Sequence, residues 1–94
     1  MKIRGIIWLE EIVEKLHWKH NVSRAEVREV LASRPKFRFV EKGHRSGENV
    51  YSASGRTDAG RYLTLFFVYK KNREALILSA RKMTPKERKR YERK

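Results

Sequence analysis

Residues 61–80 read RYLTLFFVYKKNREALILSA and contain two apolar runs separated by a short charged segment. The runs, residues 61–69 and 75–80, carry apolar side chains at both odd and even positions, a pattern typical of central strands. Residues 70–73 are polar and predict a turn between the two strands. We therefore expect an antiparallel pair in which the start of the first strand lies beside the end of the second.

The segment after this strand pair predicts a helix with a defined start. Thr84 can cap the helix, and Pro85 suits its first position. Glu87 stands three residues after the cap, which is the spacing of a capping box. Because a buried strand leads directly into this helix, Arg81 and Lys82 are delivered to a defined place at the strand end. The end of the chain therefore predicts a structured cationic surface, and such a surface favours a function that involves binding phosphates.

Two amphipathic helices are predicted in the first third of the chain. Asn21 can close the first helix, since asparagine tolerates the left-handed conformation. Ser23 and Glu26 have capping-box spacing at the start of the second helix, and Pro35 ends it. Residues 3–8 fit either an edge strand or the approach to the first helix. The two apolar stripes consist of Leu9, Ile12, Val13 and Leu16, then Val27, Val30 and Leu31.

The middle of the chain changes to the two-residue period of strands. Residues 36–40 alternate between charged and aromatic side chains, as in a half-exposed strand. Residues 42–47 predict a polar loop, and residues 50–54 predict a second strand. A turn at residues 55–60 then leads into the apolar strands. The chain, residues 1–94, thus predicts one α+β domain: two N-terminal helices packed on an antiparallel β-meander of about four strands, then a C-terminal helix.

The net charge of +13 is spread unevenly over the 94 residues. Residues 1–33 carry six Lys/Arg and five Glu, whereas residues 34–80 carry ten Lys/Arg against four acids and residues 81–94 carry eight against two. The excess charge therefore belongs to the predicted sheet and last helix. It implies an acidic partner: nucleic acid, an acidic protein or an anionic membrane surface.

The composition also excludes several kinds of site and location. The sequence has no cysteine, which excludes disulfides, thiol catalysis and cysteine-based zinc sites. It has no long apolar run and no signal-like segment, so we expect no membrane partner and a cytoplasmic location. The carboxylates outside the first two helices show no paired spacing for acid–base work or for Mg²⁺. If the chain cleaves a substrate, we expect it to do so without a metal or other cofactor.

Two clusters of side chains are candidates for catalysis. Lys19 and His20 stand at the junction of the two helices, where a histidine can serve as a general acid or base. The alternative is that both cations simply meet the negative end of the helix dipole. The second cluster contains Arg56, Arg61, Arg81 and Lys82, which the predicted meander brings to one end of the sheet. Arginines there can hold a phosphate and stabilise developing charge, or they can be solvated strand-end charges.

Weaker candidates lie on the last helix and in the polar loop. Arg88 and Tyr91 are three residues apart and so share one face of the helix. Tyr91 can stack on an unpaired base, or it can pack its ring on the sheet. Arg45 follows His44 in the loop and is a candidate RNA contact. Trp18 is most simply an anchor in the core or in an interface.

Several of these segments, in this order, resemble the BrnT family of toxins from bacterial type II toxin–antitoxin systems. The Lys-His junction and the Ser-Ala-Arg-Lys ending of the last strand are the most specific of them. Two positions depart from the family pattern: Leu9 stands where an acidic residue is usual, and Asn21 where glycine is usual. The matching segments are Trp8, KHNVS at 19–23, EVREV at 26–30, GR at 55–56, GRYL at 60–63, ILSARKMTPKER at 77–88, and Tyr91.

The resemblance implies a RelE-like fold and a metal-independent endoribonuclease. In the reaction of such an enzyme, a 2′-hydroxyl of the RNA attacks the adjacent phosphate, so the substrate supplies the nucleophile. The resemblance also implies a cognate DNA-binding antitoxin that neutralises the toxin in a higher-order complex, and this complex represses its own operon. It points to Lys19, His20, Arg61, Arg81 and Lys82 for catalysis, and to Arg56, Arg88 and Tyr91 for RNA. The rival hypotheses are a non-catalytic nucleic-acid-binding module and an inactive relative that acts as a corepressor.

Overall fold

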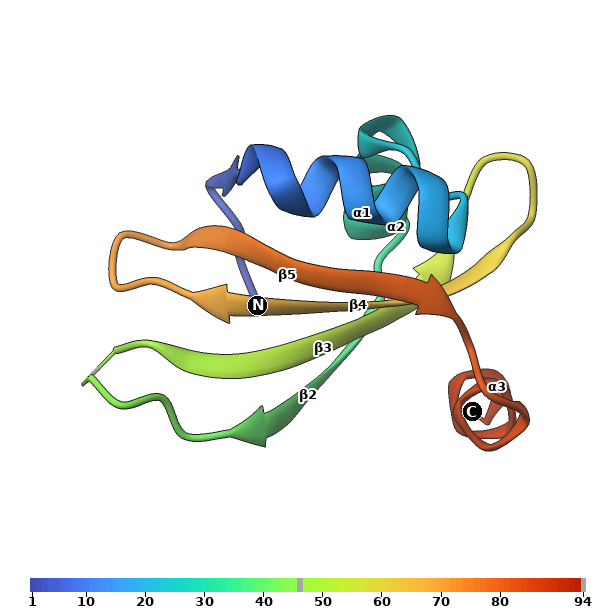
Figure 1. Ribbon diagram of the computed structural model, residues 1–94. Coiled ribbons are helices and arrows are strands. Elements are labelled where there is room, and N and C mark those ends of the chain that lie inside the picture. The colour runs from blue at the N-terminus through green and yellow to red at the C-terminus, as the bar shows by residue number, and fades with distance from the viewer. Residues whose placement is uncertain (46, 94) are drawn as a thin grey trace.

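The computed structural model describes residues 1–45 and 47–93, and these form a five-stranded sheet with three helices (Figure 1). The strand order is β1-β5-β4-β3-β2. The α+β class and the four-stranded antiparallel meander, β2 to β5, are confirmed. The elements are β1 (Gly5–Ile7), α1 (Glu10–His20), α2 (Arg24–Ala32), β2 (Lys36–Glu41), β3 (Asn49–Arg56), β4 (Tyr62–Tyr69), β5 (Glu74–Lys82) and α3 (Pro85–Glu92).

The two apolar strands pair as predicted, with the start of β4 beside the end of β5. Thr64 near the start of β4 pairs with Arg81 near the end of β5. A bulge interrupts this ladder after Phe66, because Phe66 pairs with Ser79 and the next residue of β4 pairs with Ile77. Residues 3–8, for which the sequence allowed two interpretations, contain the edge strand β1. It runs parallel to β5, and the long connection through α1, α2 and three strands provides the crossover that a parallel pair requires.

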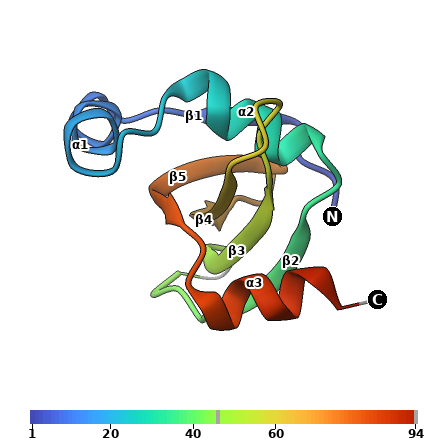
Figure 2. The same cartoon turned by 90° about the vertical axis from the view of Figure 1, so that its right-hand side faces the viewer.

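The hydrophobic core lies between one face of the sheet and the two N-terminal helices. Leu63, Leu65 and Phe67 of β4 are fully buried, as are Val27 and Val30 of α2. The intervening residues of β4 point to the opposite face, because successive strand side chains alternate. Of the helices that the structure describes, α3 packs on that second face, and it covers one end of it (Figures 1 and 2). The central strands are therefore apolar on both faces, with α1 and α2 packed on one face and α3 on one end of the other.

The helix boundaries follow the local signals in the sequence. Ser23 and Glu26 form a complete capping box at α2, and Thr84 and Glu87 form another at α3. Asn21 closes α1 in the left-handed conformation, with φ 52° and ψ 44°. Leu9 precedes α1 without a side-chain hydrogen bond, as expected for the departure from the family pattern. None of the helices in the described part of the chain is long and apolar enough to cross a membrane.

Candidate functional site

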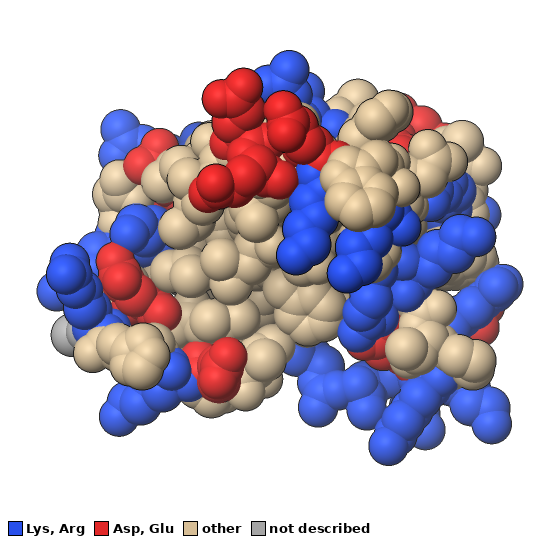
Figure 3. Space-filling view, in the orientation of Figure 1, with Lys and Arg blue, Asp and Glu red and all other residues tan. Residues whose placement is uncertain are grey.

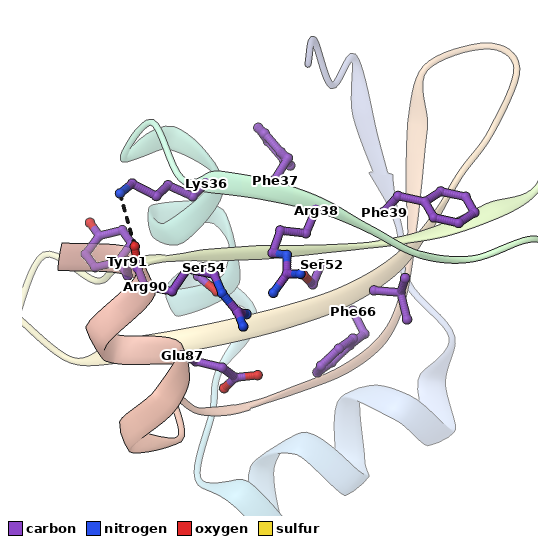
Figure 4. A pocket seen from close by; sticks show the side chains of 11 residues that line it. Lys36, Phe37, Arg38, Phe39, Ser52, Ser54, Phe66, Glu87, Arg90 and Tyr91 are labelled. Carbon is purple, nitrogen blue, oxygen red and sulfur yellow. Dashed lines mark hydrogen bonds between the residues drawn. The ribbon is translucent and has the colours of Figure 1, made fainter. Parts of the chain in front are cut away.

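A groove of about 730 Å³ lies between α3 and the open face of β2, β3 and β4 (Figure 4). The close-up shows Arg38 and Arg90 directed into this groove, whereas Phe37 points away from it. Phe66 and the serine hydroxyls of β3 lie along the sheet side. The groove combines cations, hydroxyls and an aromatic ring, which are the groups that bind single-stranded nucleic acid. Its lining residues are Lys36, Phe37, Arg38, Phe39, Val40, Ser52, Ser54, Phe66, Glu87, Arg90 and Tyr91.

Arg38, Phe66 and Arg90 of this groove were not identified by the sequence analysis. The alternation of β2 was a usable signal for Arg38, since Lys36 and Arg38 must share the face opposite Phe37. No comparable signal existed for Arg90. It reaches the groove only because α3 folds back across the sheet.

Arg81 lies on the α3 side of the sheet and is held by Glu87. The guanidinium donates from Nη1 to Oε1 at 2.7 Å and from Nη2 to Oε2 at 2.9 Å. It also lies 5.1 Å from the ring centroid of Phe66. The same carboxylate accepts a hydrogen bond from the Thr64 hydroxyl at 3.2 Å and from the Thr84 backbone N–H at 2.8 Å. Arg81 is therefore fixed in one orientation beside the groove.

The pairing of Arg81 with Glu87 changes the titration of both groups. The hydrogen bond from Arg81 lowers the pKa of Glu87 below its ordinary value, although burial acts in the opposite direction. The hydrogen bond to Glu87 raises the pKa of Arg81 further. Both groups therefore carry their full charge at neutral pH.

Arg61 lies on the other side of the sheet and is held by a second capping-box glutamate. Its Nη1 donates to Glu26 Oε2 at 2.7 Å and to the Asn21 carbonyl at 2.8 Å. Burial raises the pKa of Glu26, but the hydrogen bonds from Arg61 and from the Ser23 backbone outweigh it and leave that pKa below the ordinary value. Each helix that starts with a capping box thus uses the box carboxylate to hold one arginine.

The four cations predicted to gather at one sheet end are therefore divided between two sides. Arg81 shares the α3 side with Arg56, whose strand partner is Tyr62. Arg61 contacts the α1–α2 junction instead. Lys82 is exposed and pairs with Leu63 of the core face, so alternation places it on the side opposite Arg81. The backbone ends meet as predicted, but the side chains do not form one cluster.

Lys19 and His20 lie at the end of α1, on the helix-covered side. Lys19 is exposed, and His20 is half-buried next to Asn21, the residue whose carbonyl accepts from Arg61. The Lys-His junction therefore lies next to Arg61. The junction is on the α1 side of the sheet, opposite the α3 side on which the groove lies (Figure 1). The described residues contain no group of three or more His, Cys, Asp or Glu that is arranged to hold a metal ion.

The candidates on α3 contact the start of β4. Tyr91 is half-buried and packs edge-on against Tyr62, with 6.0 Å between ring centroids. Packing is thus one role that Tyr91 fulfils. Arg88 lies over the Tyr62 ring, 3.9 Å from its centroid. Arg45, in contrast, belongs to the connection between β2 and β3, at the sheet end opposite Arg56.

The surface charge reflects this division of the molecule. In Figure 3, Lys and Arg side chains gather around α3 and the neighbouring strand ends, while acidic side chains gather over the first half of α1. Trp18 on α1 is 75% exposed and has no role in the core. The cationic surface and the groove therefore coincide on the α3 side.

The model of the family described as "Ribonuclease toxin, BrnT, of type II toxin-antitoxin system" matches residues 8–87. The chain belongs to the BrnT family. BrnT toxins are thus its relatives, and a crystal structure of the ribonuclease toxin BrnT from Brucella abortus has a similar fold. The likeness has a TM-score of 0.62 at 16% identity, and it covers 88% of this chain and 99% of the Brucella chain. None of the curated proteins matches this chain.

Proposed function

We propose that this protein is an endoribonuclease toxin that cleaves RNA without a metal ion and takes its substrate in the groove beside α3. The observation that carries the proposal is the groove itself. Arg38 and Arg90 point into it on the sheet face where Glu87 holds Arg81, and the chain belongs to the BrnT family. The proposal applies to cytoplasmic RNA. Inhibition of translation and growth would follow from the loss of RNA.

The proposed reaction needs little from the protein beyond position and charge. The 2′-oxygen of one nucleotide attacks the adjacent phosphorus and loses its proton, and the 5′-oxygen of the next nucleotide leaves and gains one. The products carry a 2′,3′-cyclic phosphate and a 5′-hydroxyl. The protein must hold the chain in line, transfer the two protons and stabilise the added negative charge. In this proposal Arg81 stabilises the phosphate, because its orientation is already set by Glu87.

A second placement of the reaction centre rests on a separate observation. Arg61 bonds the Asn21 carbonyl and so joins the Lys19-His20 junction to the turn before β4. His20 would then transfer a proton and Arg61 would hold the phosphate, with Lys82 nearby on the same side of the sheet. The two placements lie on opposite faces, so substitutions separate them.

The partner in this proposal is a cognate antitoxin, whose acidic segment covers the cationic surface that RNA uses. Such coverage inhibits by occlusion and requires no change in the catalytic side chains. DNA binding by the antitoxin and a higher-order complex are parts of the same proposal. Because Lys82 lies on the side opposite Arg81, the test concerns the α3 side: a structure of the complex that leaves Arg81 and the groove open to solvent would contradict it.

The test is cleavage of end-labelled RNA by the purified protein in EDTA. We expect cleavage with a cyclic phosphate end, and none when the attacking 2′-hydroxyl is replaced by hydrogen. Arg81→Ala and Arg38→Ala should slow cleavage if the groove is the site, whereas His20→Ala and Arg61→Ala should slow it if the junction is. Arg28→Gln, at an exposed position of α2, serves as the charge-matched control.

Three outcomes would contradict this function or a part of it. RNA binding that remains salt-dependent without any cleavage would identify a non-catalytic binding module. Cleavage that stops in EDTA and returns with Mg²⁺ would refute metal independence. An inactive protein that only assists its antitoxin on operator DNA would show the corepressor activity instead.

A further inference from the structure

Three cationic side chains lie over two tyrosine rings near the end of the groove. The rings belong to Tyr62 of β4 and Tyr91 of α3, with an angle of 79° between their planes. The guanidinium carbons of Arg56 and Arg88 lie 4.7 Å and 3.9 Å from the Tyr62 centroid. Lys36 Nζ lies 5.8 Å from the Tyr91 centroid. We call these five residues, contributed by four elements, the tyrosine–cation cluster.

Among the described residues, the charges of this cluster are only weakly balanced by carboxylates, in contrast to those of Arg61 and Arg81. Within the described part of the chain, its one ion pair joins Arg88 to Glu92 at 3.6 Å, and both side chains are 52% exposed. Exposed pairs of this kind contribute about 0–1 kcal/mol. Lys36 donates to backbone carbonyls of Arg90 and Arg93 at the end of α3, which leaves its charge in place.

Such a gathering of like charges favours an anion. Each ring face attracts a cation by only about 0.5–1 kcal/mol at an exposed site, so the repulsion between neighbouring guanidiniums remains largely uncompensated. An arriving phosphate removes that repulsion and accepts forked hydrogen bonds from arginine. The rings reduce the entropy cost, because they hold both arginines in place before the anion binds.

We propose that the tyrosine–cation cluster binds the sugar–phosphate backbone of RNA and holds the part of the chain that leaves the groove past α3. Lys36 and Tyr91 line the groove as well, so one RNA strand can follow both surfaces without a gap. The inference rests on the proposed function for its ligand, but it assigns binding rather than catalysis. Tyr62 is the central residue, since two cations depend on its ring.

The test is the salt dependence of binding to an RNA whose 2′-hydroxyls are replaced by hydrogen at the cleaved positions, measured by fluorescence anisotropy. Each lost phosphate contact lowers the slope of log affinity against log salt by about 0.7 for a single strand. Arg56→Gln and Arg88→Gln should each remove about one such contact, and Tyr62→Leu about two. Tyr62→Phe keeps the ring and should restore the wild-type slope. Arg28→Gln is the charge-matched control on α2.

The outcomes separate this inference from the proposed function. Cleavage by the wild type together with unchanged slopes in Tyr62→Leu, Arg56→Gln and Arg88→Gln would overturn the cluster alone. Reduced slopes without cleavage would support the cluster and overturn the proposed catalysis. A wild-type protein that binds no RNA would overturn both. A cluster whose substitutions weaken binding only to an acidic peptide of the antitoxin, and not to RNA, would overturn the cluster inference alone. Because Arg56 and Arg88 are exposed, Arg56→Gln and Arg88→Gln should fold, and their slopes test the inference even if Tyr62→Leu fails to fold.

Discussion

Replacing Glu87 with glutamine removes the negative charge that fixes Arg81 but preserves the shape of the side chain. The glutamate side chain is 20% exposed and that of Arg81 is 33% exposed. Breaking a fully buried pair costs about 3–5 kcal/mol, whereas an exposed pair contributes about 0.2–1 kcal/mol. For this partly buried pair we expect Glu87→Gln to lower the free energy of unfolding by about 1–2 kcal/mol. In a domain of this size the melting temperature should fall by about 5–15 °C.

The assay is urea unfolding followed by circular dichroism, as a double-mutant cycle with Arg81→Gln. The coupling energy between the two sites should be about 1 kcal/mol at pH 7. Glu26→Gln is the matched control, since Glu26 occupies the same capping-box position in α2 but bonds Arg61. The losses in free energy of unfolding caused by Glu26→Gln and by Arg81→Gln should be additive, with no coupling energy between them. A coupling energy for Glu87 and Arg81 that equals the control value would refute this account of the pair.

The same pair predicts how stability depends on pH. The pKa of Glu87 is lower in the folded protein than its ordinary value of 4.5. A carboxyl group with a lowered folded pKa stabilises the protein above its unfolded pKa, and that contribution is lost as the pH falls through the folded value. The stability difference between wild type and Glu87→Gln should therefore be constant near neutrality and shrink below about pH 4.5. A difference that persists unchanged in acid would contradict the assigned cause.

Three further substitutions test the packing. Phe67→Ala empties a fully buried position and should cost about 3–5 kcal/mol by urea unfolding; a cost under about 1 kcal/mol would place the core elsewhere. Gly55→Ala would set a Cβ 2.7 Å from the Ser33 hydroxyl, so we expect a loss of about 1–3 kcal/mol by the same measurement, and wild-type stability would contradict that close approach. Trp18→Ala should change stability by no more than about 0.5 kcal/mol, since the ring is 75% exposed, and a larger loss in thermal unfolding would show a hidden contact.

The arginines around the candidate site are of two kinds: some are held by a carboxylate, and others lie over an aromatic ring. Arg61 and Arg81 are each held by a carboxylate at 2.7 Å, so their charge is balanced before any ligand arrives. Arg56 and Arg88 lie over the Tyr62 ring, and the carboxylate beside Arg88, that of Glu92, forms only an exposed pair at 3.6 Å. Balanced arginines suit precise positioning at one phosphate, whereas unbalanced ones suit attraction of a long anionic chain. Both kinds lie around the same sheet end.

Local signals in the sequence were sufficient for the elements and for most of the topology. A capping box is formed by residues three apart, so Thr84 and Glu87 determine the start of α3 wherever that helix lies. The pairing of β4 with β5 follows from a short polar turn between two apolar runs. The same signals placed Arg81 correctly at the strand end beside the start of β4.

Only the tertiary structure decided which side chains meet. Alternation along a strand fixes that Arg81 and Lys82 point to opposite faces, but the packing of α1 and α2 decides which face becomes the core. The groove depends on Lys36 reaching the end of α3 through contacts 54 and 57 residues away in sequence, and no local pattern encodes such a contact. The sequence by itself thus determined a cationic strand end and a capped helix. The layer packing then separated Arg61 from Arg81 and brought Arg38 and Arg90 into one groove, because side-chain direction depends on where the helices bury their apolar faces.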